Sequence, residues 1–300
     1  MDISLYIHIP FCKSKCAYCS FASFANQDEL IPAYVKALDL EARMYQGTEI
    51  RTVYIGGGTP THLPMEEIQK ILALVRSRFI LTEDVELTME ANPATFDLKK
   101  AVGLQQLGVN RMSLGLQSLD DNKLKYLGRP HTARQGRSSF DVLRKAGIQK
   151  INTDLIYSLT GQCPEEIERD VAGLAALAAE HISLYSFTIG EDSEFYRRKI
   201  AAPPPEKQAA HYEQVATLLK DSGFEHYEVS NFARSGFACR HNLNYWQGGD
   251  YIGLGVAAHS HRDGHRSWNV CDIAAYLEMV GDKGSAKIGE ERLGAPERLL

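Results

Sequence analysis

The stretch YIHIPFCKSKCAYCSF, residues 6–21, decides how this sequence is interpreted. Its first part belongs to an apolar, β-rich run from Leu5 to Ile9, which predicts a strand. Directly after that strand come Cys12, Cys16 and Cys19, with the spacing C-x3-C-x2-C. One loop can therefore present three thiolates to a single inorganic group. A [4Fe-4S] cluster held by three cysteines keeps one iron free of protein ligands, so a small molecule can coordinate there.

A structural zinc site is the alternative for this loop, with His8 as the fourth ligand. Zinc sites of that kind are closed by four ligands, whereas the loop itself supplies three. A disulfide framework fits less well, because three of the six cysteines are crowded into residues 12–19 of a long chain. Clustered thiols in a reducing compartment usually hold metal, so we expect a metal centre here.

Strand and helix patterns alternate from this loop onward. Runs rich in β-forming residues predict strands at residues 5–9, 52–55, 85–90, 111–116, 151–156 and 182–188. Apolar residues at helical spacing predict helices at residues 30–45, 65–79, 98–107, 133–146 and 166–178. Such successive βα units form a parallel sheet, either curled into a barrel or open and doubly wound. The expected fold is α/β, with a partial, open (β/α)6 barrel of the TIM type.

Residues with distinctive chemistry directly follow the predicted strands. They are Pro10 to Cys19, Gly56 to Thr59, Glu90 to Pro93, Gln117 and Asp154. The carboxyl ends of parallel strands meet at one edge of the sheet, where such proteins bind ligands. We therefore expect one site at the C-terminal mouth of the barrel.

The character of the chain changes after Pro203, Pro204 and Pro205, which mark a break before a predicted helix at residues 206–222. From Phe224 the sequence is rich in aromatic residues and glycine, and it predicts a short hairpin near residues 265–269. We expect a barrel core over residues 1–223 and a small antiparallel and helical extension over residues 224–300.

Composition excludes several classes of function. The formal charge of -5 offers no basic stripe for a phosphate backbone, so nucleic-acid binding is not expected. The N-terminus lacks a basic segment followed by a long apolar run, and no stretch of about 18 apolar residues occurs. We expect a soluble, cytoplasmic protein with at most peripheral membrane association.

Further motifs extend the pattern set by the cysteine loop. They are VYIGGGTPT at residues 53–61, MEANP at 89–93, GLQS at 115–118, LGRPHT at 127–132 and NTDLIYSL at 152–159. With these motifs in this order, the sequence resembles the radical S-adenosylmethionine (SAM) superfamily, and within it the coproporphyrinogen III dehydrogenase-like family and its heme-chaperone branch. The resemblance covers nearly the whole chain. It implies that the three loop cysteines hold a [4Fe-4S] cluster and that SAM binds beside it.

The same resemblance implies residues that contact the cofactors. Around SAM they are Gly57, Gly58, Thr59, Glu90, Gln117, Arg129 and Asp154, and beside the cluster Tyr6 and Tyr18. The chemistry agrees, because an arginine suits a carboxylate and acids suit an amine or ribose hydroxyls. Glycines leave room for a ligand against the backbone.

Two features favour the heme-chaperone branch over the oxidase branch. The oxidase carries a further cysteine two residues after the last cluster cysteine, where this chain has Phe21. The oxidase also has an N-terminal arm, whereas this chain enters its first predicted strand within a few residues of Met1. Coproporphyrinogen III dehydrogenase activity is therefore not expected, although an oxygen-independent oxidase-like enzyme remains the alternative.

The segment HNLNYW, residues 241–246, matches an HNxxYW motif linked to heme in that branch. By resemblance, heme is a ligand, acceptor hemoproteins are partners, and His241 is an axial ligand of the heme iron, with Cys239 as the alternative. The same segment also suits a packing cluster around a hydrogen-bonded histidine. His259 and His261 stand in an alternating pattern that is structural or, alternatively, metal-binding.

Two departures from the family pattern bear on function. Ser158 and Thr160 stand where the family usually has glycine and proline, so the loop after the fifth predicted strand is expected to differ. The family usually continues into a helical C-terminal domain, whereas this chain ends at Leu300. We expect an abbreviated protein, and heme delivery to an acceptor is the function that this would affect.

Overall fold

The computed structural model describes residues 3–294. The strands are β1 (Ser4–Ile9), β2 (Phe11–Cys12), β3 (Phe24–Ala25), β4 (Glu49–Gly57), β5 (Ile80–Ala91), β6 (Arg111–Gln117), β7 (Lys150–Tyr157), β8 (His181–Ser186), β9 (Glu225–His226), β10 (Asn231–Ala233), β11 (Tyr251–Leu254), β12 (His259–Arg262), β13 (His265–Asn269) and β14 (Lys287–Arg292). The α-helices are α1 (Ile31–Ala42), α2 (Met65–Arg78), α3 (Leu98–Gln106), α4 (Asp121–Leu127), α5 (Ala133–Lys145), α6 (Pro164–Ala175), α7 (Glu194–Arg197), α8 (Pro205–Asp221), α9 (Arg240–Trp246) and α10 (Ile273–Lys283).

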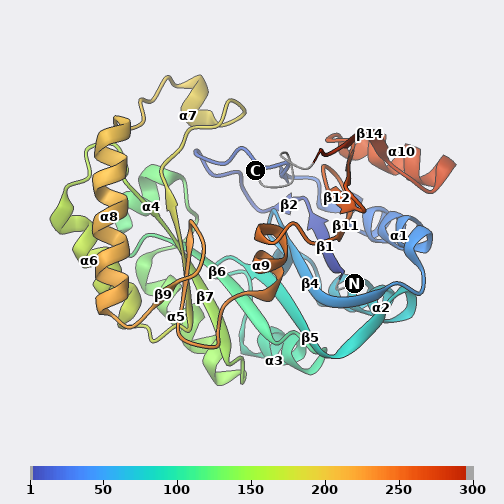
Figure 1. Ribbon diagram of the computed structural model, residues 1–300, viewed down its shortest axis with the longest axis horizontal. Helices are drawn as coiled ribbons and strands as arrows, with labels where there is room; N and C mark the ends of the chain where they lie inside the picture. The colour runs from blue at the N-terminus through green and yellow to red at the C-terminus, as the bar shows by residue number, and fades with distance from the viewer. Residues whose placement is uncertain (1–2, 295–300) are drawn as a thin grey trace.

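One 12-stranded sheet runs through the molecule in the order β14-β13-β12-β11-β1-β4-β5-β6-β7-β8-β10-β9. Its middle strands, β1 and β4 to β8, are all parallel and curve around a common interior, with the connecting helices outside (Figure 1). β8 pairs onward with β10 instead of returning to β1, so the barrel is open. The predicted partial, open (β/α)6 barrel is confirmed, and each predicted strand lies within a few residues of the observed one.

Local sequence signals explain where the helices begin. Pro205 occupies the first turn of α8, where its missing N–H costs no hydrogen bond. The α5 helix opens with a capping box in which Thr132 and Gln135 bond each other's backbone N–H groups. The short α4, which sequence periodicity does not reveal, is capped by Asp120 and ends at Gly128 in the left-handed conformation.

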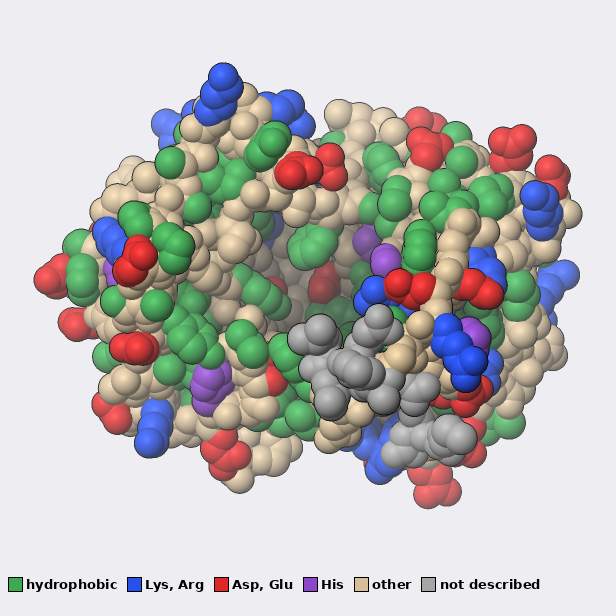
Figure 2. Space-filling model, turned by 45° about the horizontal axis from the view of Figure 1, so that its top comes forward, with side chains coloured by type: hydrophobic (Ala, Val, Ile, Leu, Met, Phe, Trp, Pro, Cys, Tyr) green, Lys and Arg blue, Asp and Glu red, His purple; other side chains and the backbone are tan. Residues whose placement is uncertain are grey.

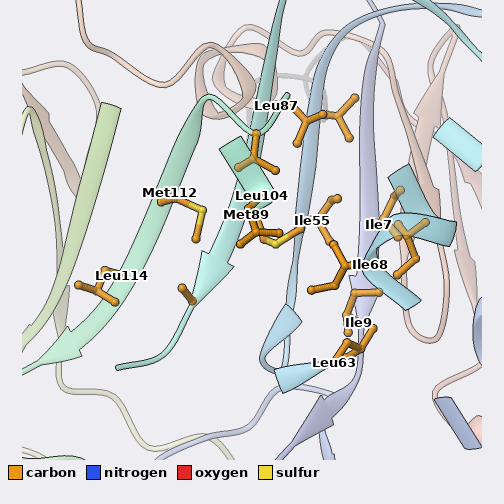
Figure 3. Packing of buried hydrophobic residues seen from close by; sticks show 14 of the residues in the cluster. Ile7, Ile9, Ile55, Leu63, Ile68, Leu87, Met89, Leu104, Met112 and Leu114 are labelled. Carbon is orange, nitrogen blue, oxygen red and sulfur yellow. The ribbon is translucent and has the colours of Figure 1, made fainter. Parts of the chain in front are cut away.

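The main core lies between the sheet and the helices outside it. In Figure 3, Ile7 and Ile9 of β1, Ile55 of β4 and Met89 of β5 lie among the packed side chains together with Ile68 of α2. Each of these side chains is at most 1% exposed. Alternate residues of a strand face opposite sides, so the residues between them point into the barrel interior. Those interior positions carry the polar groups of the candidate site.

The C-terminal part extends this sheet at both edges. β11 pairs in parallel with β1, and β12, β13 and β14 continue it as an antiparallel meander. The predicted hairpin is β12–β13, whose turn places Asp263 and Gly264 at φ 51° and 78°. At the opposite edge, β10 and β9 follow β8. Strands after residue 223 therefore share one sheet with the barrel. Within residues 3–294, no helix has the length and apolar character needed to cross a membrane.

The α9 segment lies at the N-terminal ends of the barrel strands. Arg111, at the start of β6, donates hydrogen bonds to the carbonyl oxygens of Phe237 and Ala238, at 2.7 and 3.2 Å. The Arg111 guanidinium also forms a buried ion pair with Glu86 at 3.2 Å. Because charged groups are costly to bury without partners, this network holds the segment before α9 in one place.

Candidate cluster and cofactor site

A cavity of about 300 Å³ opens among the carboxyl ends of the parallel strands, and we call it the strand-end cavity. It is lined by these predicted site residues: Cys12, Cys16, Tyr18, Cys19, Gly57, Gly58, Glu90, Gln117, Arg129 and Asp154. Figure 2 shows one face of the molecule hollowed near its middle, with hydrophobic and acidic side chains around the hollow. The structure thus brings together residues separated by more than a hundred positions in the sequence.

The cysteine loop forms one wall of this cavity. The Sγ atom of Cys12 lies 3.4 Å from Oγ1 of Thr59, and that of Cys19 lies 3.9 Å from Oγ of Ser23. Burial raises the pKa of both thiols. Thiolates in such surroundings need a positive partner, which an iron centre supplies. Arg129 adds a further positive charge by donating a hydrogen bond to Sγ of Cys16 at 3.4 Å.

The geometry does not favour the zinc alternative with His8. Its Nδ1 atom lies 2.9 Å from the hydroxyl of Tyr6, and its Nε2 atom lies 2.8 Å from the carbonyl oxygen of Ala22. Among the residues that the structure describes, no three His, Cys, Asp or Glu side chains converge on one metal ion. A four-iron cluster occupies more space than one ion, so its thiolates need not converge on a point. The donor set of three half-buried thiols at the cavity wall therefore fits a cluster better than a single zinc ion.

Two glycines at the end of β4 allow close packing that a side chain would prevent. Gly57 has φ +113°, and a Cβ atom there would lie 2.5 Å from the His8 ring. A Cβ atom on Gly58 would lie 2.8 Å from the carbonyl oxygen of Phe11, which is backbone and cannot swing away. Gly58 also donates its N–H to the carbonyl oxygen of Ile9 at 2.8 Å. These glycines hold the strand end tightly against the cysteine loop.

Two half-buried carboxylates, Glu90 and Asp154, line the strand-end cavity. Glu90 accepts hydrogen bonds from the Gly57 N–H and the Tyr54 hydroxyl, both at 2.9 Å, and burial raises its pKa. Burial, and then the charge of Glu90, raise the pKa of Asp154 to about 7, opposed by bonds from Asn152 and Ser113. Two half-buried acids that repel each other favour a ligand with positive charge. The sulfonium and ammonium groups of SAM have that property.

Arg129 connects the carboxylate wall to the cysteine loop. Its Nη2 atom donates to Oδ1 of Asn92 at 2.5 Å and to the carbonyl oxygen of Gly115 at 2.6 Å. Asn92 in turn donates to Oγ1 of Thr59 at 2.7 Å. Asn92 belongs to the MEANP segment expected at this strand end, but the sequence did not assign it a contact of its own.

Buried polar atoms near Arg129 point to a missing ligand. Oε1 of Gln117 and Nε of Arg129 are buried without a hydrogen-bond partner in the part of the chain that the structure describes. Gln117 also has φ +65°, a left-handed conformation that is strained for a residue with a side chain. Buried polar groups are normally paired, so these atoms are suited to bond a bound cofactor.

Three predicted residues lie outside the lining of this cavity. Thr59 is just behind the cysteine loop, in hydrogen-bond contact with Cys12. Tyr6 lines a different cavity, and its hydroxyl bonds to His8. His241 lies at the other end of the barrel strands, in α9.

His241 is packed as a hydrogen-bonded histidine. Its side chain is only 1% exposed, with Nδ1 2.8 Å from Oγ1 of Thr52 and Nε2 2.9 Å from the hydroxyl of Tyr245. Burial lowers its pKa to about 3, so the ring is neutral. Coordination to heme iron would require breaking the bond to Thr52 or the bond to Tyr245. The alternative Cys239 is also buried, at 3% exposure, with its Sγ 3.4 Å from a Glu86 oxygen.

Comparison with known proteins identifies the family. A profile of the radical SAM superfamily matches residues 6–172. The heme chaperone HemW of Escherichia coli (strain K12) is 40% identical over 262 residues, which are 86% of this chain and 69% of the relative. HemW of Bacillus subtilis (strain 168) is 35% identical over 291 residues, covering 94% and 76%. The chain belongs to the radical SAM superfamily and, within it, to the HemW family.

Solved structures agree with membership of the radical SAM superfamily. Coproporphyrinogen III oxidase (HemN) from Escherichia coli superposes with a TM-score of 0.87 at 25% identity, covering 98% of this chain and 72% of that one. Streptococcus suis SuiB has a TM-score of 0.52 at 16% identity, covering 73% and 47%, and shows the shared fold alone. For a radical SAM protein, the family implies a [4Fe-4S] cluster and SAM.

Proposed function

We propose that the protein is a radical SAM heme chaperone, which binds heme and delivers it to hemoproteins while carrying a [4Fe-4S] cluster and SAM. The observation that supports the two cofactors is the lining of the strand-end cavity, which combines the three loop cysteines with Gly57 and Gly58 and with the carboxylates of Glu90 and Asp154. The similarity to heme chaperones of the HemW family supports the heme part.

In this proposal Cys12, Cys16 and Cys19 hold the cluster. The cluster would supply one iron without a cysteine ligand, at which SAM can coordinate. Around it, the chain's own groups bind SAM, with Glu90 and Asp154 facing its positive charges and Arg129 suited to its carboxylate. Tyr18, half-buried in the loop and lining the cavity, shields that side from water.

Cysteine substitutions test the cluster assignment. Each of Cys12→Ala, Cys16→Ala and Cys19→Ala should lose the iron-sulfur absorbance after anaerobic reconstitution, because each removes a required thiolate. Cys271→Ala is the matched control, since Cys271 is a free, exposed cysteine remote from the loop in the sequence. Iron and sulfide analysis is the measurement. A full complement of four irons in any of the three loop variants would contradict the assignment.

The competing function is an oxygen-independent coproporphyrinogen III oxidase, because the HemN structure superposes over almost the whole chain. Phe21 argues against the oxidase function, because the oxidase branch has a further cysteine at this position. An anaerobic assay with coproporphyrinogen III, SAM and a reductant separates the two functions. We expect no decarboxylation above background, and turnover would favour the oxidase.

Hemin titration tests the chaperone itself. Added hemin should give a shifted Soret band with the wild-type protein, and hemin-loaded protein should then transfer its heme to an apo-hemoprotein. Absence of binding by the wild type would refute the chaperone proposal. Binding without transfer would show that residues 1–300 hold heme but do not deliver it.

A further inference from the structure

We infer that the heme of the proposed chaperone binds in a second cavity, and that His259 is the ligand of its iron. We call it the aromatic cavity. It measures about 310 Å³ and is lined by Tyr6, His8, Phe21, Ala22, Tyr245, Tyr251, Ala257 and His259. This inference rests on the proposed function for the identity of the ligand, and on the geometry of this cavity for its location.

The walls suit a flat apolar ring. Phe21 is 66% exposed and Tyr245 is 40% exposed, so both present aromatic surface to water at the cavity. Tyr245 packs edge-on against Tyr251, with ring centroids 4.7 Å apart. A porphyrin placed between these rings would cover aromatic surface that water now contacts.

The histidines near this cavity differ in whether they can bind iron. His8 and His241 each have both ring nitrogens in hydrogen bonds. His259 lines the cavity, is exposed, and uses neither ring nitrogen in a hydrogen bond within residues 3–294. Its ring stacks near Trp268, with centroids 6.0 Å apart and planes 27° apart, which restrains the direction of the imidazole. His259 is therefore the histidine of this cavity whose nitrogens are available.

The protonation state and nearby charges agree with this role. Although His259 is exposed, partial desolvation of its ring against the cavity wall, and then the charge of Arg266, lower its pKa, which favours a neutral ring with a nitrogen lone pair free for iron. Lys15 lies beside Phe21 and donates to its carbonyl oxygen at 3.3 Å. Lys15 thus places one positive charge beside a wall residue of the cavity, which suits a heme propionate, whereas Arg266 is already paired with Glu291.

The position of the cavity also fits a carrier. Phe21 lines both the aromatic cavity and the strand-end cavity. The side chain of Phe21 would therefore lie between the heme and the cluster site. Several lining residues are exposed, so the ring would be only partly covered. A shallow site with one histidine ligand releases its ligand more readily than a closed pocket, as delivery requires.

The experiment compares hemin binding by His259→Ala and wild type, with His265→Ala as the control. His265 is an exposed histidine in the same hairpin and does not line the cavity. We expect His259→Ala to lose the Soret shift and to bind hemin at least about tenfold more weakly. Added imidazole should restore the band in His259→Ala by filling the vacated ligand position. His265→Ala should match the wild type.

Two further variants test the aromatic wall of the cavity and the alternative ligand His241. Phe21→Ala should weaken hemin binding severalfold, because it removes an exposed aromatic side chain that lines the aromatic cavity. Tyr245→Phe removes the hydrogen bond to His241 but keeps the aromatic wall, so the Soret band should be unchanged. If His241 were the ligand, freeing its Nε2 would instead strengthen hemin binding.

The outcomes separate the two proposals. Wild-type protein that binds no hemin refutes the chaperone function and this inference together. Wild-type binding with an unchanged spectrum and affinity in His259→Ala overturns only the inference. Loss of the band in both His259→Ala and His265→Ala also overturns it, because the effect would then belong to the hairpin and not to one imidazole. Retained iron-sulfur absorbance in His259→Ala shows that the variant is folded.

Discussion

Replacing Asp154 by Asn tests whether the strand-end cavity selects a positively charged cofactor. Burial and the neighbouring Glu90 raise the pKa of Asp154 from 3.8 to about 7 in the folded protein. A cation binds the ionised form, so the affinity for SAM should rise with pH as Asp154 loses its proton. With a pKa near 7, about one tenth of the protein is ionised at pH 6 and about three quarters at pH 7.5. The wild type should therefore bind SAM about eightfold more tightly at pH 7.5 than at pH 6.

The Asp154→Asn variant should lose most of this pH dependence. At pH 7.5 it lacks one partner of a buried charge pair, which costs about 2–3 kcal/mol, or about 30- to 150-fold in affinity. Equilibrium dialysis with labelled SAM and reconstituted protein measures both effects. Asp141→Asn on the exposed surface of α5 is the control and should behave as wild type.

A wild-type affinity that is constant between pH 6 and 7.5 would refute the proposed titration. Equal affinities for the wild type and Asp154→Asn at pH 7.5 would show that this carboxylate does not face the cofactor. Glu90 has a raised pKa of its own and remains in the variant, so the two acids titrate as a pair in the wild type. A weak residual pH dependence in Asp154→Asn is therefore compatible with the proposal.

Two other predictions concern the framework of the site. Gly58→Ala should lower the iron content after reconstitution at least severalfold, because its Cβ would meet the Phe11 carbonyl oxygen at 2.8 Å, whereas Gly281→Ala, with open space around it, should not. Burial raises the pKa of Glu41 from 4.5 to about 7, so the folded state binds this proton more tightly than the unfolded state does. The free energy of unfolding should then fall as pH rises from about 4.5 to 7, with Glu41 contributing up to about 3 kcal/mol of that fall. Urea unfolding measures the free energy of unfolding at pH 5 and at pH 7. The change in this free energy between the two pH values should be smaller for Glu41→Gln than for the wild type. An equal change in both proteins would show that Glu41 is not the group that titrates.

Features that depend on neighbouring residues were predictable from the sequence. Strand and helix positions follow from the period of apolar residues, which is a local property, and the six parallel strands were found within a few residues of their predicted bounds. The cysteine loop and the acids at strand ends were also predictable as one site. Parallel strands place their carboxyl ends together, whatever the details of packing.

Contacts between segments that are distant in the sequence decided which side chains are hydrogen-bonded and which line the aromatic cavity. Thr52 and His241 are 189 positions apart, and no local pattern shows that their side chains bond and thereby bury the expected heme ligand. Likewise, Phe21 meets Tyr251 and His259 in one cavity because β11 pairs in parallel with β1 and β12 continues from β11. The sequence alone determined the residue types, their periodicity and the cluster motif. Only the tertiary structure decided which histidine has free nitrogens, because hydrogen bonding and burial depend on side chains brought together by the whole fold.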